Sequence, residues 1–143
     1  MKTTIELNCE FSNSLELDPR NPYLQKYGLD YGYLTYSWDK ILREETTEIG
    51  RAIAEKNDVE IIDGAFDTAV VALNIAYKAF RMKGFGHEEA AAKTEEGFRR
   101  VCLNNLTKLN ENGKPEFNEQ GKVIKPEGYK KVELQDLLIK EGE

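Results

Sequence analysis

The segment from Asp58 to Met82 constrains the fold of this chain more than any other. Its apolar residues cover most of the circumference of a helix, so we expect a helix that is buried on nearly every side. These residues are Ile61, Ile62, Ala65, Phe66, Ala69, Val70, Ala72, Leu73 and Ala76. One narrow strip is polar, and it contains Glu60, Asp63, Asp67 and Asn74, with Lys78 in line. A surface helix has a broad polar face instead, so the segment predicts an acidic strip inside a buried helix.

Two more helical segments flank this one, over about Ser37 to Lys56 and about His87 to Leu109. Between the first two, Asn57 is a good N-cap type, and Lys83-Gly84-Phe85-Gly86 ends a helix in the way that glycine C-caps do. The periodicity therefore predicts an all-α fold.

The rest of the chain is poorly patterned. Turns follow Asn110, so we expect a loop-rich tail from about residue 110, with a small hairpin between Phe117 and Val123-Ile124 and a last short helix from Leu134 to Ile139. Residues 1–34 form an N-terminal arm and residues 35–143 the helical domain in this interpretation.

The arm itself carries two weak signals. Thr3 to Leu7 alternates weakly like a strand. Four tyrosines crowd the second part of the arm, and they pack on the domain or on another subunit, or else one ring stacks on a planar ligand. They are Tyr23, Tyr27, Tyr31 and Tyr33.

Composition removes several classes of protein. Twenty Lys and Arg against 26 Asp and Glu give a net charge of −6, which argues against binding to nucleic acid polymers or to an anionic membrane. One His and two Cys are too few for a Cys/His zinc site or a disulfide framework. Two free thiols fit a reducing compartment, so a cytoplasmic location is expected. Chemistry in this chain therefore depends on carboxylates.

Acids also fall on the apolar stripe of the segment 37–56. The stripe consists of Trp38, Ile41, Leu42, Ile49, Ala52 and Ile53. Glu45 falls near its centre, Glu48 lies along its edge, and Glu44 points further round. Close carboxylates must share protons or bind a cation, and oxygen ligands alone select Mg²⁺, Mn²⁺ or Ca²⁺.

A structural role stays open for each acid taken singly. In that alternative, Glu44 and Glu45 are ordinary acids in the first half of a helix, beside Lys40 and Arg43, and Asn57-x-x-Glu60 is a capping box. The inward placement of Glu45, Asp63 and Asp67 together favours a cation site.

Two sets of residues carry a resemblance to a known family. Glu44-Glu45-Thr46-Thr47-Glu48 followed by Glu60-Ile61-Ile62-Asp63 resembles the acidic helix motifs of the all-α nucleoside triphosphate pyrophosphohydrolases, which are the MazG-like and phosphoribosyl-ATP pyrophosphohydrolase-like superfamily. Asn105 to Leu109, Asn112-Gly113-Lys114-Pro115 and the run from Gly121 to Tyr129 resemble the C-terminal signature of phage and bacterial members. Many members place the second acid pair where this chain has Gly64 and Asp67, so Glu60, Asp63 and Asp67 all stay candidates.

The resemblance implies a four-helix-type bundle that is completed by oligomerisation as a homodimer or homotetramer. It implies Mg²⁺-dependent cleavage of a nucleoside triphosphate to the monophosphate and pyrophosphate, with Mn²⁺ as a possible substitute. Glu44 or Glu45 then activates water. The metal ligands come from Glu45, Glu48, Glu60, Asp63 and Asp67. The candidates for contact with the substrate are Asn74, Asn105, Lys108, Lys122, Lys125 and Tyr129.

Two alternatives stay open. One is the phosphoribosyl-ATP pyrophosphohydrolase of histidine biosynthesis, and the other is a non-catalytic helical interaction module of the same fold. Other phosphate motifs fail, because Gly121-Lys122 is not followed by Ser or Thr and Gly84-Phe85-Gly86 lacks a third glycine.

Overall fold

The computed structural model describes residues 1–141. Within that range the protein is all-α, with bundle-like packing of its helices and a single isolated bridge between Phe117 and Val123 in place of strands. The chain divides into two compact units, residues 1–94 and the part from Glu95 onward. The division therefore falls within α6 (His87–Leu106).

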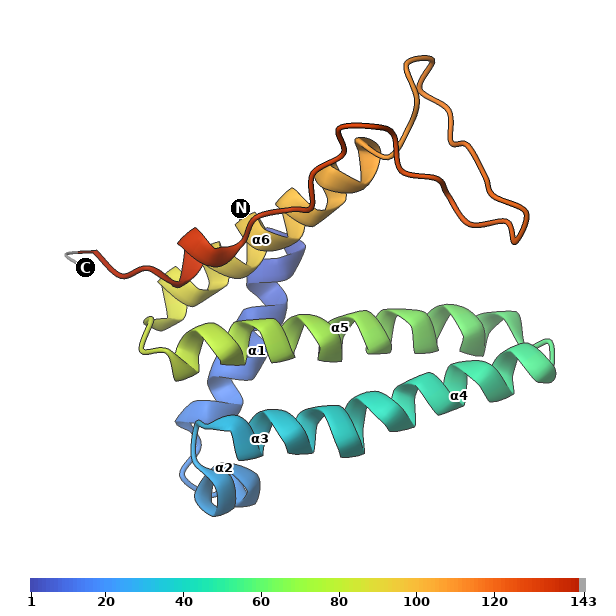
Figure 1. Ribbon diagram of the computed structural model, residues 1–143. Helices are drawn as coiled ribbons and strands as arrows, with labels where there is room; N and C mark the ends of the chain where they lie inside the picture. The colour runs from blue at the N-terminus through green and yellow to red at the C-terminus, as the bar shows by residue number, and fades with distance from the viewer. Residues whose placement is uncertain (142–143) are drawn as a thin grey trace. The chain divides into compact units, whose positions relative to one another are not determined.

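Two long antiparallel helices, α4 (Arg43–Ala54) and α5 (Asp58–Met82), lie side by side in the first unit (Figure 1). The Asn57 side chain accepts a hydrogen bond of 3.2 Å from the Glu60 backbone N–H and so caps α5. After the last residue of α5, Gly84 takes a φ of +96°, which a glycine adopts without steric cost. The predicted bounds of α5 are confirmed at both ends.

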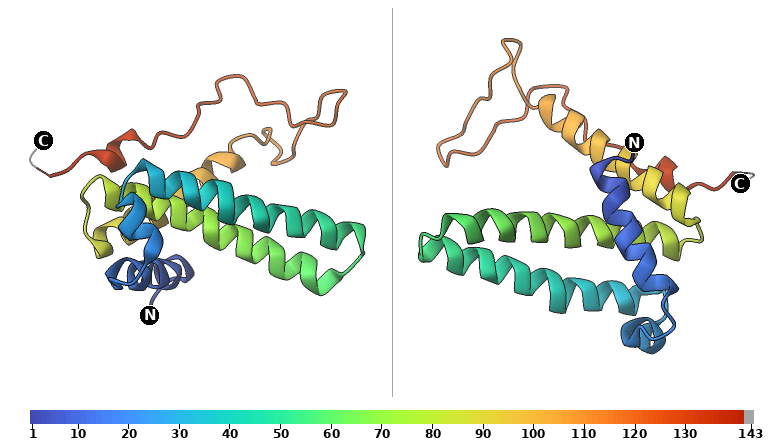
Figure 2. Two further views of the ribbon diagram at one scale, coloured as in Figure 1. Left: turned by 90° about the horizontal axis from the view of Figure 1, so that it is seen from below. Right: turned by 180° about the vertical axis from the view of Figure 1, so that it is seen from behind.

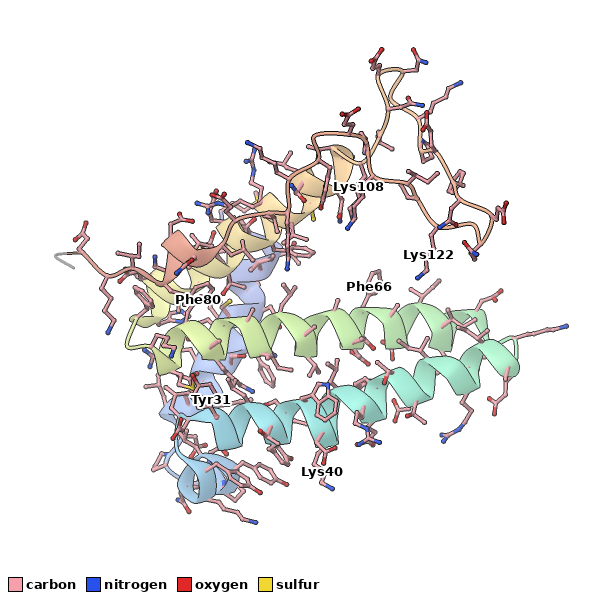
Figure 3. The ribbon with its side chains drawn as sticks, viewed as in Figure 1. Tyr31, Lys40, Phe66, Phe80, Lys108 and Lys122 are labelled. Atoms are coloured by element: carbon pink, nitrogen blue, oxygen red, sulfur yellow. The ribbon has the colours of Figure 1, made fainter. Side chains whose placement is uncertain are left out.

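The other helices of the first unit leave the face of α5 opposite α4 uncovered. Val59, Ile62 and Phe66 are 73%, 57% and 68% exposed, and Figure 3 shows Phe66 on the side of α5 that points away from α4. The α4 side is closed, because Gly64 is buried against Ile49. The prediction of a helix buried on nearly every side is therefore wrong for the isolated chain.

A π-helical segment, η1 (Ser37–Leu42), leads without a break into α4. In a regular α-helix each residue advances by about 100°, so Trp38 and Glu45 would share a face. A π turn holds more residues and rotates less at each one, so Trp38 leaves that face. Trp38 is 53% exposed and lies 5.7 Å from the Arg43 guanidinium. The predicted stripe is corrected here, since Trp38 and Ile53 are exposed and Ala52 is its one fully buried member.

The N-terminal residues form a helix, α1 (Thr4–Leu17), so the expectation of a strand and an extended arm is wrong. A capping box starts the helix, because the Glu6 backbone N–H donates to Thr3 Oγ1 (3.0 Å) and the Thr3 N–H donates to Glu6 Oε1 (3.4 Å). α1 packs against α5 (Figure 2), where Asn8 donates from its side chain to the Val70 carbonyl.

The tyrosine-rich segment folds into α2 (Pro22–Tyr27) and α3 (Tyr31–Tyr36). Tyr36 stacks on Tyr23 with ring centres 4.0 Å apart and on Tyr27 at 6.2 Å. Tyr33 is buried. Tyr23, Tyr27 and Tyr33 therefore pack on the chain's own helices, while Tyr31 is 62% exposed. The alternative of a ring that stacks on a planar ligand stays a prediction.

The core of the first unit joins α1, α5 and the start of α6. Cys9, Tyr77 and Phe85 are buried in it together with Ile5, Ala90 and Ala91. The only histidine, His87, shares a 2.8 Å hydrogen bond with the Tyr77 hydroxyl, so its imidazole serves this core.

The second unit is held by contacts between the later turns of α6 and the chain end. Arg100 pairs with both carboxylate oxygens of Asp136 at 2.8 and 3.0 Å. Leu137 is buried and approaches Gly97. The predicted last helix is present as a short 3₁₀ turn, η2 (Gln135–Leu138).

The predicted hairpin is present, with a bridge between Phe117 and Val123. The residues between them form the second of two matching loops, and the first loop precedes Phe117. In the first, Asn110 Oδ1 accepts the backbone N–H groups of Asn112 and Lys114. In the second, Asn118 Oδ1 accepts those of Gln120 and Lys122. Each loop has a glycine with positive φ before its lysine, Gly113 at +74° and Gly121 at +80°. The same five-residue pattern, Asn-Glu-x-Gly-Lys, therefore builds the same loop twice.

Candidate functional site

Glu45 is the central residue of the acidic site, and it lies on α4 where that helix faces α5. Its side chain is half-buried, and its Oε2 is buried without a hydrogen-bond partner. Burial raises the pKa of the Glu45 carboxyl, and the carboxylates of Glu48, Asp67, Glu44 and Asp63 raise it further, in that order. An acid with a raised pKa and a free buried oxygen has the properties of a proton acceptor or of a cation ligand.

The structure separates the three α5 candidates. Asp63 and Asp67 both act on the Glu45 carboxyl, and Asp67 acts more strongly. Glu60 is not among the groups that perturb Glu45, and its backbone N–H is capped by Asn57. The capping is one-sided, since the Asn57 N–H donates to the Ala52 carbonyl. Among the three candidates, Asp63 and Asp67 are therefore the carboxylates whose charges act on Glu45.

The acids around Glu45 are more open than the sequence indicated. Glu44, Glu48, Asp63 and Asp67 are exposed, and so is Glu60. The prediction that the polar strip of α5 lies inside the protein is therefore wrong for Glu60, Asp63 and Asp67. By helical periodicity, these three α5 carboxylates lie on the flank of the helix, between its α4-facing side and its open apolar face.

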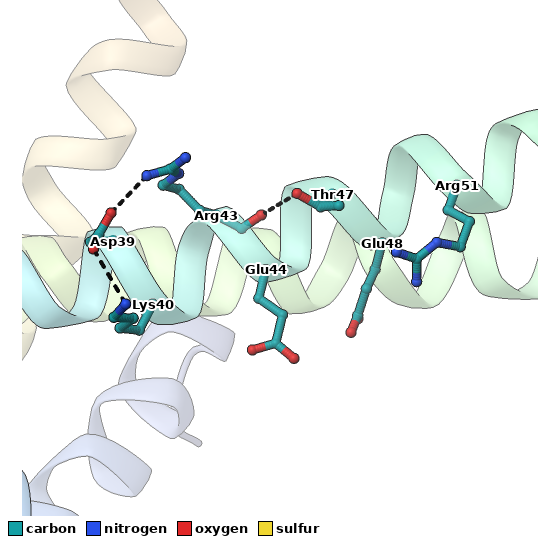
Figure 4. Close-up of a pocket in the computed structure, with 7 residues that line it drawn as sticks. All are labelled: Asp39, Lys40, Arg43, Glu44, Thr47, Glu48 and Arg51. Carbon is teal, nitrogen blue, oxygen red and sulfur yellow. Dashed lines mark hydrogen bonds and ion pairs between the residues drawn. The ribbon is translucent and has the colours of Figure 1, made fainter.

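Glu44 and Glu48 also line a hollow of about 470 Å³ on the outer surface of α4 and η1. Both carboxylates point to the same side of the helix (Figure 4). Arg43 and Arg51 line the hollow too, and Arg43 pairs with Asp39 at 2.8 Å. Because every lining residue comes from one helical stretch, the hollow is a surface feature of that stretch.

Asn74 is separated from the acids by its burial. Its Oδ1 accepts a 2.5 Å hydrogen bond from the Ser12 hydroxyl of α1. The side chain predicted to contact substrate thus joins α5 to α1.

The metal implied by the family resemblance is tested by the donors and by their grouping. The donors are carboxylate oxygens, which suit Mg²⁺ or Mn²⁺, and the unpartnered Glu45 Oε2 fits a missing cation. Within residues 1–141, no three His, Cys, Asp or Glu side chains gather closely enough to hold a metal ion. The donor chemistry therefore fits, and a closed ligand shell is not preformed in the single chain.

The candidate phosphate contacts lie in the second unit. Lys108 donates to Asn105 Oδ1 at 2.9 Å, so this predicted pair is brought together. Lys125 lies 5.2 Å from the ring of Tyr129. Lys122 belongs to the second Asn-Glu-x-Gly-Lys loop, well away from Lys108 along the hairpin (Figure 3). The predicted phosphate contacts of the second unit therefore fall into three separate groups.

The hydroxyl of Tyr129 has a structural partner, because it donates to Asn104 Oδ1 at 2.8 Å. Lys108 is the one predicted lysine that lines a hollow of about 750 Å³, which also contains Glu111, Glu116 and Glu127. These acids would oppose a phosphate.

One charged residue that the sequence placed only on the polar strip has a distinctive environment. Lys78 is 6% exposed and lines a cavity formed by α1, α2, α3 and η1. Its position in the strip, one turn after Asn74, gave no sign of burial.

Comparison with protein-family models, with curated proteins and with solved structures finds no match to this chain. In the described part, none of the helices is long and apolar enough to cross a bilayer.

Proposed function

We propose that the chain is a Mg²⁺-dependent nucleoside triphosphate pyrophosphohydrolase whose acidic site lies between α4 and α5. The observation that carries the proposal is Glu45, a half-buried carboxyl with an unpartnered oxygen and carboxylates from both helices around it. The motif resemblance described above supports the same reaction. Mn²⁺ is the expected substitute for Mg²⁺.

Glu48, Asp63 and Asp67 would hold the ion, and Glu45 stays off it. Glu48, Asp63 and Asp67 are exposed, so their side chains can change rotamer at little cost to the packing. When bound, Mg²⁺ supplies neutralisation of phosphate charge and activation of water.

Glu45 is the better of the two candidate bases. Its pKa is raised by burial and by neighbouring acids, which brings it closer to the range in which a general base works at neutral pH. Glu44 is exposed on the outer surface of α4. Glu45 accepts the proton of the attacking water, and hydrolysis yields the monophosphate and pyrophosphate.

The test is pyrophosphate release by the full chain across a panel of NTPs and dNTPs with Mg²⁺ or Mn²⁺. We expect Glu45→Gln and Asp67→Asn to lower the rate by at least about 100-fold, because each removes a group that acts on the reacting water or holds the ion. Glu55→Gln is the matched control, an exposed acid at the C-cap of α4 that lies outside the site. Normal release by both site variants, or no release by the wild type with any substrate, would contradict the proposal.

Phosphoribosyl-ATP belongs in the same panel. Preferential release from it would assign the chain to the histidine-pathway alternative. Release from common or modified dNTPs at a higher rate supports the proposed substrate class.

We further propose that the active form is a homodimer or a higher homo-oligomer. The open face of α5 presents Val59, Ile62 and Phe66, and water contact of such large apolar groups favours association. A second copy covering this face would lie beside Asp63 and Asp67. Sedimentation of the wild type against Phe66→Glu tests it, with the variant expected to be monomeric.

A non-catalytic helical interaction module is the second candidate. The same open face of α5 favours it, together with the absence of a preformed metal cluster in the described residues. Thermal melting with Mg²⁺ and a nucleotide separates the two, since an enzyme that binds both is stabilised by them.

A further inference from the structure

A cavity of about 530 Å³ lies at the end of the first unit that carries the tyrosines. Its walls are mainly apolar, formed by Tyr23, Tyr33 and Tyr36 with Leu15, Pro22 and Ile41. The size lies within the usual range for small-molecule sites, which are mostly apolar with a few polar groups. The aromatic walls favour a flat ligand.

Lys78 lines this cavity and is almost completely buried. Its Nζ donates to Ser37 Oγ at 3.2 Å and lies 4.5 Å from the centre of the Tyr33 ring. An ammonium has three N–H donors, and Ser37 accepts one. Among the described residues, no carboxylate lies within ion-pair distance of Lys78.

A buried ammonium without a counter-ion is costly unless a ligand supplies the negative charge. Burial lowers the pKa of Lys78 to about 8, against a smaller opposing effect of Glu16. The amine is therefore still mainly protonated at neutral pH, so the cavity holds one positive charge.

The other charged groups near the cavity are already paired. Arg20 at the rim binds both oxygens of Asp18. Glu16 accepts from Arg81 at 2.9 Å through Oε2, its Oε1 is buried without a hydrogen-bond partner, and its charge acts on Lys78 from beyond ion-pair distance. Lys78 is thus the one lining cation of this cavity without an ion pair in the described residues, which fits a monoanion better than a dianionic phosphate.

We propose that this cavity binds a small planar aromatic monocarboxylate, with its ring against the tyrosines and its carboxylate on the Lys78 ammonium. The site stands independently of the proposed pyrophosphohydrolase activity, because it uses none of the acids around Glu45. A monocarboxylate supplies the missing negative charge and two acceptor oxygens for the free N–H groups.

The experiment is calorimetric titration of the full chain at neutral pH with 2-naphthoate, and with its neutral analogue 2-naphthamide. We expect 2-naphthoate to bind at a single site, and 2-naphthamide at least about tenfold more weakly, because it lacks the charge that Lys78 attracts. Equal affinity for the two probes, or no binding of 2-naphthoate, would overturn the proposal.

Lys78→Met keeps the length and apolar stem of the side chain and removes the charge. We expect it to weaken 2-naphthoate binding by at least about tenfold and to leave 2-naphthamide unchanged. Lys83→Met is the matched control, since Lys83 also lies near a tyrosine, with its Nζ 3.2 Å from the Tyr31 hydroxyl, but is exposed outside the cavity. Equal loss in both variants would also overturn the proposal, and the comparison of probes on the wild type decides it even where Lys78→Met folds poorly.

Discussion

Gly64 of α5 lies directly against Ile49 of α4, so closely that a Cβ added at Gly64 would meet Ile49 Cγ1 at 2.9 Å. This contact lets the two helices approach each other beside the carboxylates of Glu45 and Asp67. The absence of a side chain at one position therefore sets the spacing of the helix pair that carries the acidic site.

Gly64→Ala is expected to lower the free energy of unfolding by about 1–3 kcal/mol, because overpacking costs more than the helix propensity of alanine returns. Gly50→Ala is the matched control, since a Cβ at Gly50 of α4 meets nothing within 4 Å. The control is expected to gain about 0.5–1 kcal/mol. Urea denaturation of both variants measures the difference, and stabilisation by Gly64→Ala would contradict the close contact.

Glu45→Gln is expected to stabilise the fold at neutral pH. Burial and the surrounding acids raise the pKa of the folded Glu45 carboxyl above its ordinary value, so the folded state binds this proton more tightly than the unfolded state. The resulting stability is complete below the unfolded pKa and is lost as pH rises through the folded pKa. Thermal melts should show a gain for the variant at pH 7 that disappears near pH 4.

Lys78→Met is also expected to stabilise the fold at neutral pH, but its gain falls as pH rises, whereas the gain of Glu45→Gln grows with pH. Burial lowers the pKa of Lys78 from 10.5 to about 8, so the unfolded state binds more protons between these values and the stability of the wild type rises with pH across them. Below pH 8 the buried charge of Lys78 lowers the free energy of unfolding of the wild type by its full amount, roughly 3 kcal/mol for a pKa difference of about 2.5. The advantage of the variant should shrink between pH 8 and 10.5.

The groups that face Lys78 do not produce this trend. Glu16 is paired with Arg81 and Asp18 with Arg20. Burial, with a hydrogen bond to Tyr23, raises the pKa of Tyr36 to about 12, which is above the window. A difference between wild type and variant that stays constant with pH would show that Lys78 is not desolvated.

Asn118→Ala is expected to loosen the second Asn-Glu-x-Gly-Lys loop. The Asn118 carboxamide oxygen accepts two backbone N–H groups, those of Gln120 and Lys122, and each such bond contributes about 1 kcal/mol. Amide hydrogen exchange should speed up at both positions by about fivefold or more. Asn112→Ala is the control, because only the backbone of Asn112 takes part in the first loop, and protection that is equal in the two variants would contradict the role of Asn118.

How much of the fold follows from the sequence depends on local signals. The bounds of α5 were predictable because Asn57 caps one end and Gly84 follows the other. The start of α1 also had such a signal in Thr3-x-x-Glu6, the capping box, although the weak alternation after it favours a strand. The π segment η1 had no such signal in the sequence.

The candidate site follows from the sequence in part. Periodicity placed Glu45 on the side of α4 that faces α5, and the structure keeps it there with Asp63 and Asp67 nearby. Periodicity cannot show whether a flanking carboxylate is covered, because cover comes from other elements. For the same reason it gave no warning that α1 and α3 bury Lys78.

The π segment between α3 and α4 has a consequence for engineering this protein. Ser37, which meets the Lys78 amine, and Glu45 are eight residues apart, and regular α-helical winding would leave them roughly 80° out of phase. The wider π turn reduces the angle between Ser37 and Glu45. The continuous helix η1–α4 therefore presents Ser37 to the tyrosine cavity and Glu45 to the acidic site from the same side. Deleting one residue between Ser37 and Glu45 would leave seven regular steps of about 100° each, close to two full turns. The two residues would then stay on one side of the helix without the π turn, so the extra residue and the π turn compensate each other.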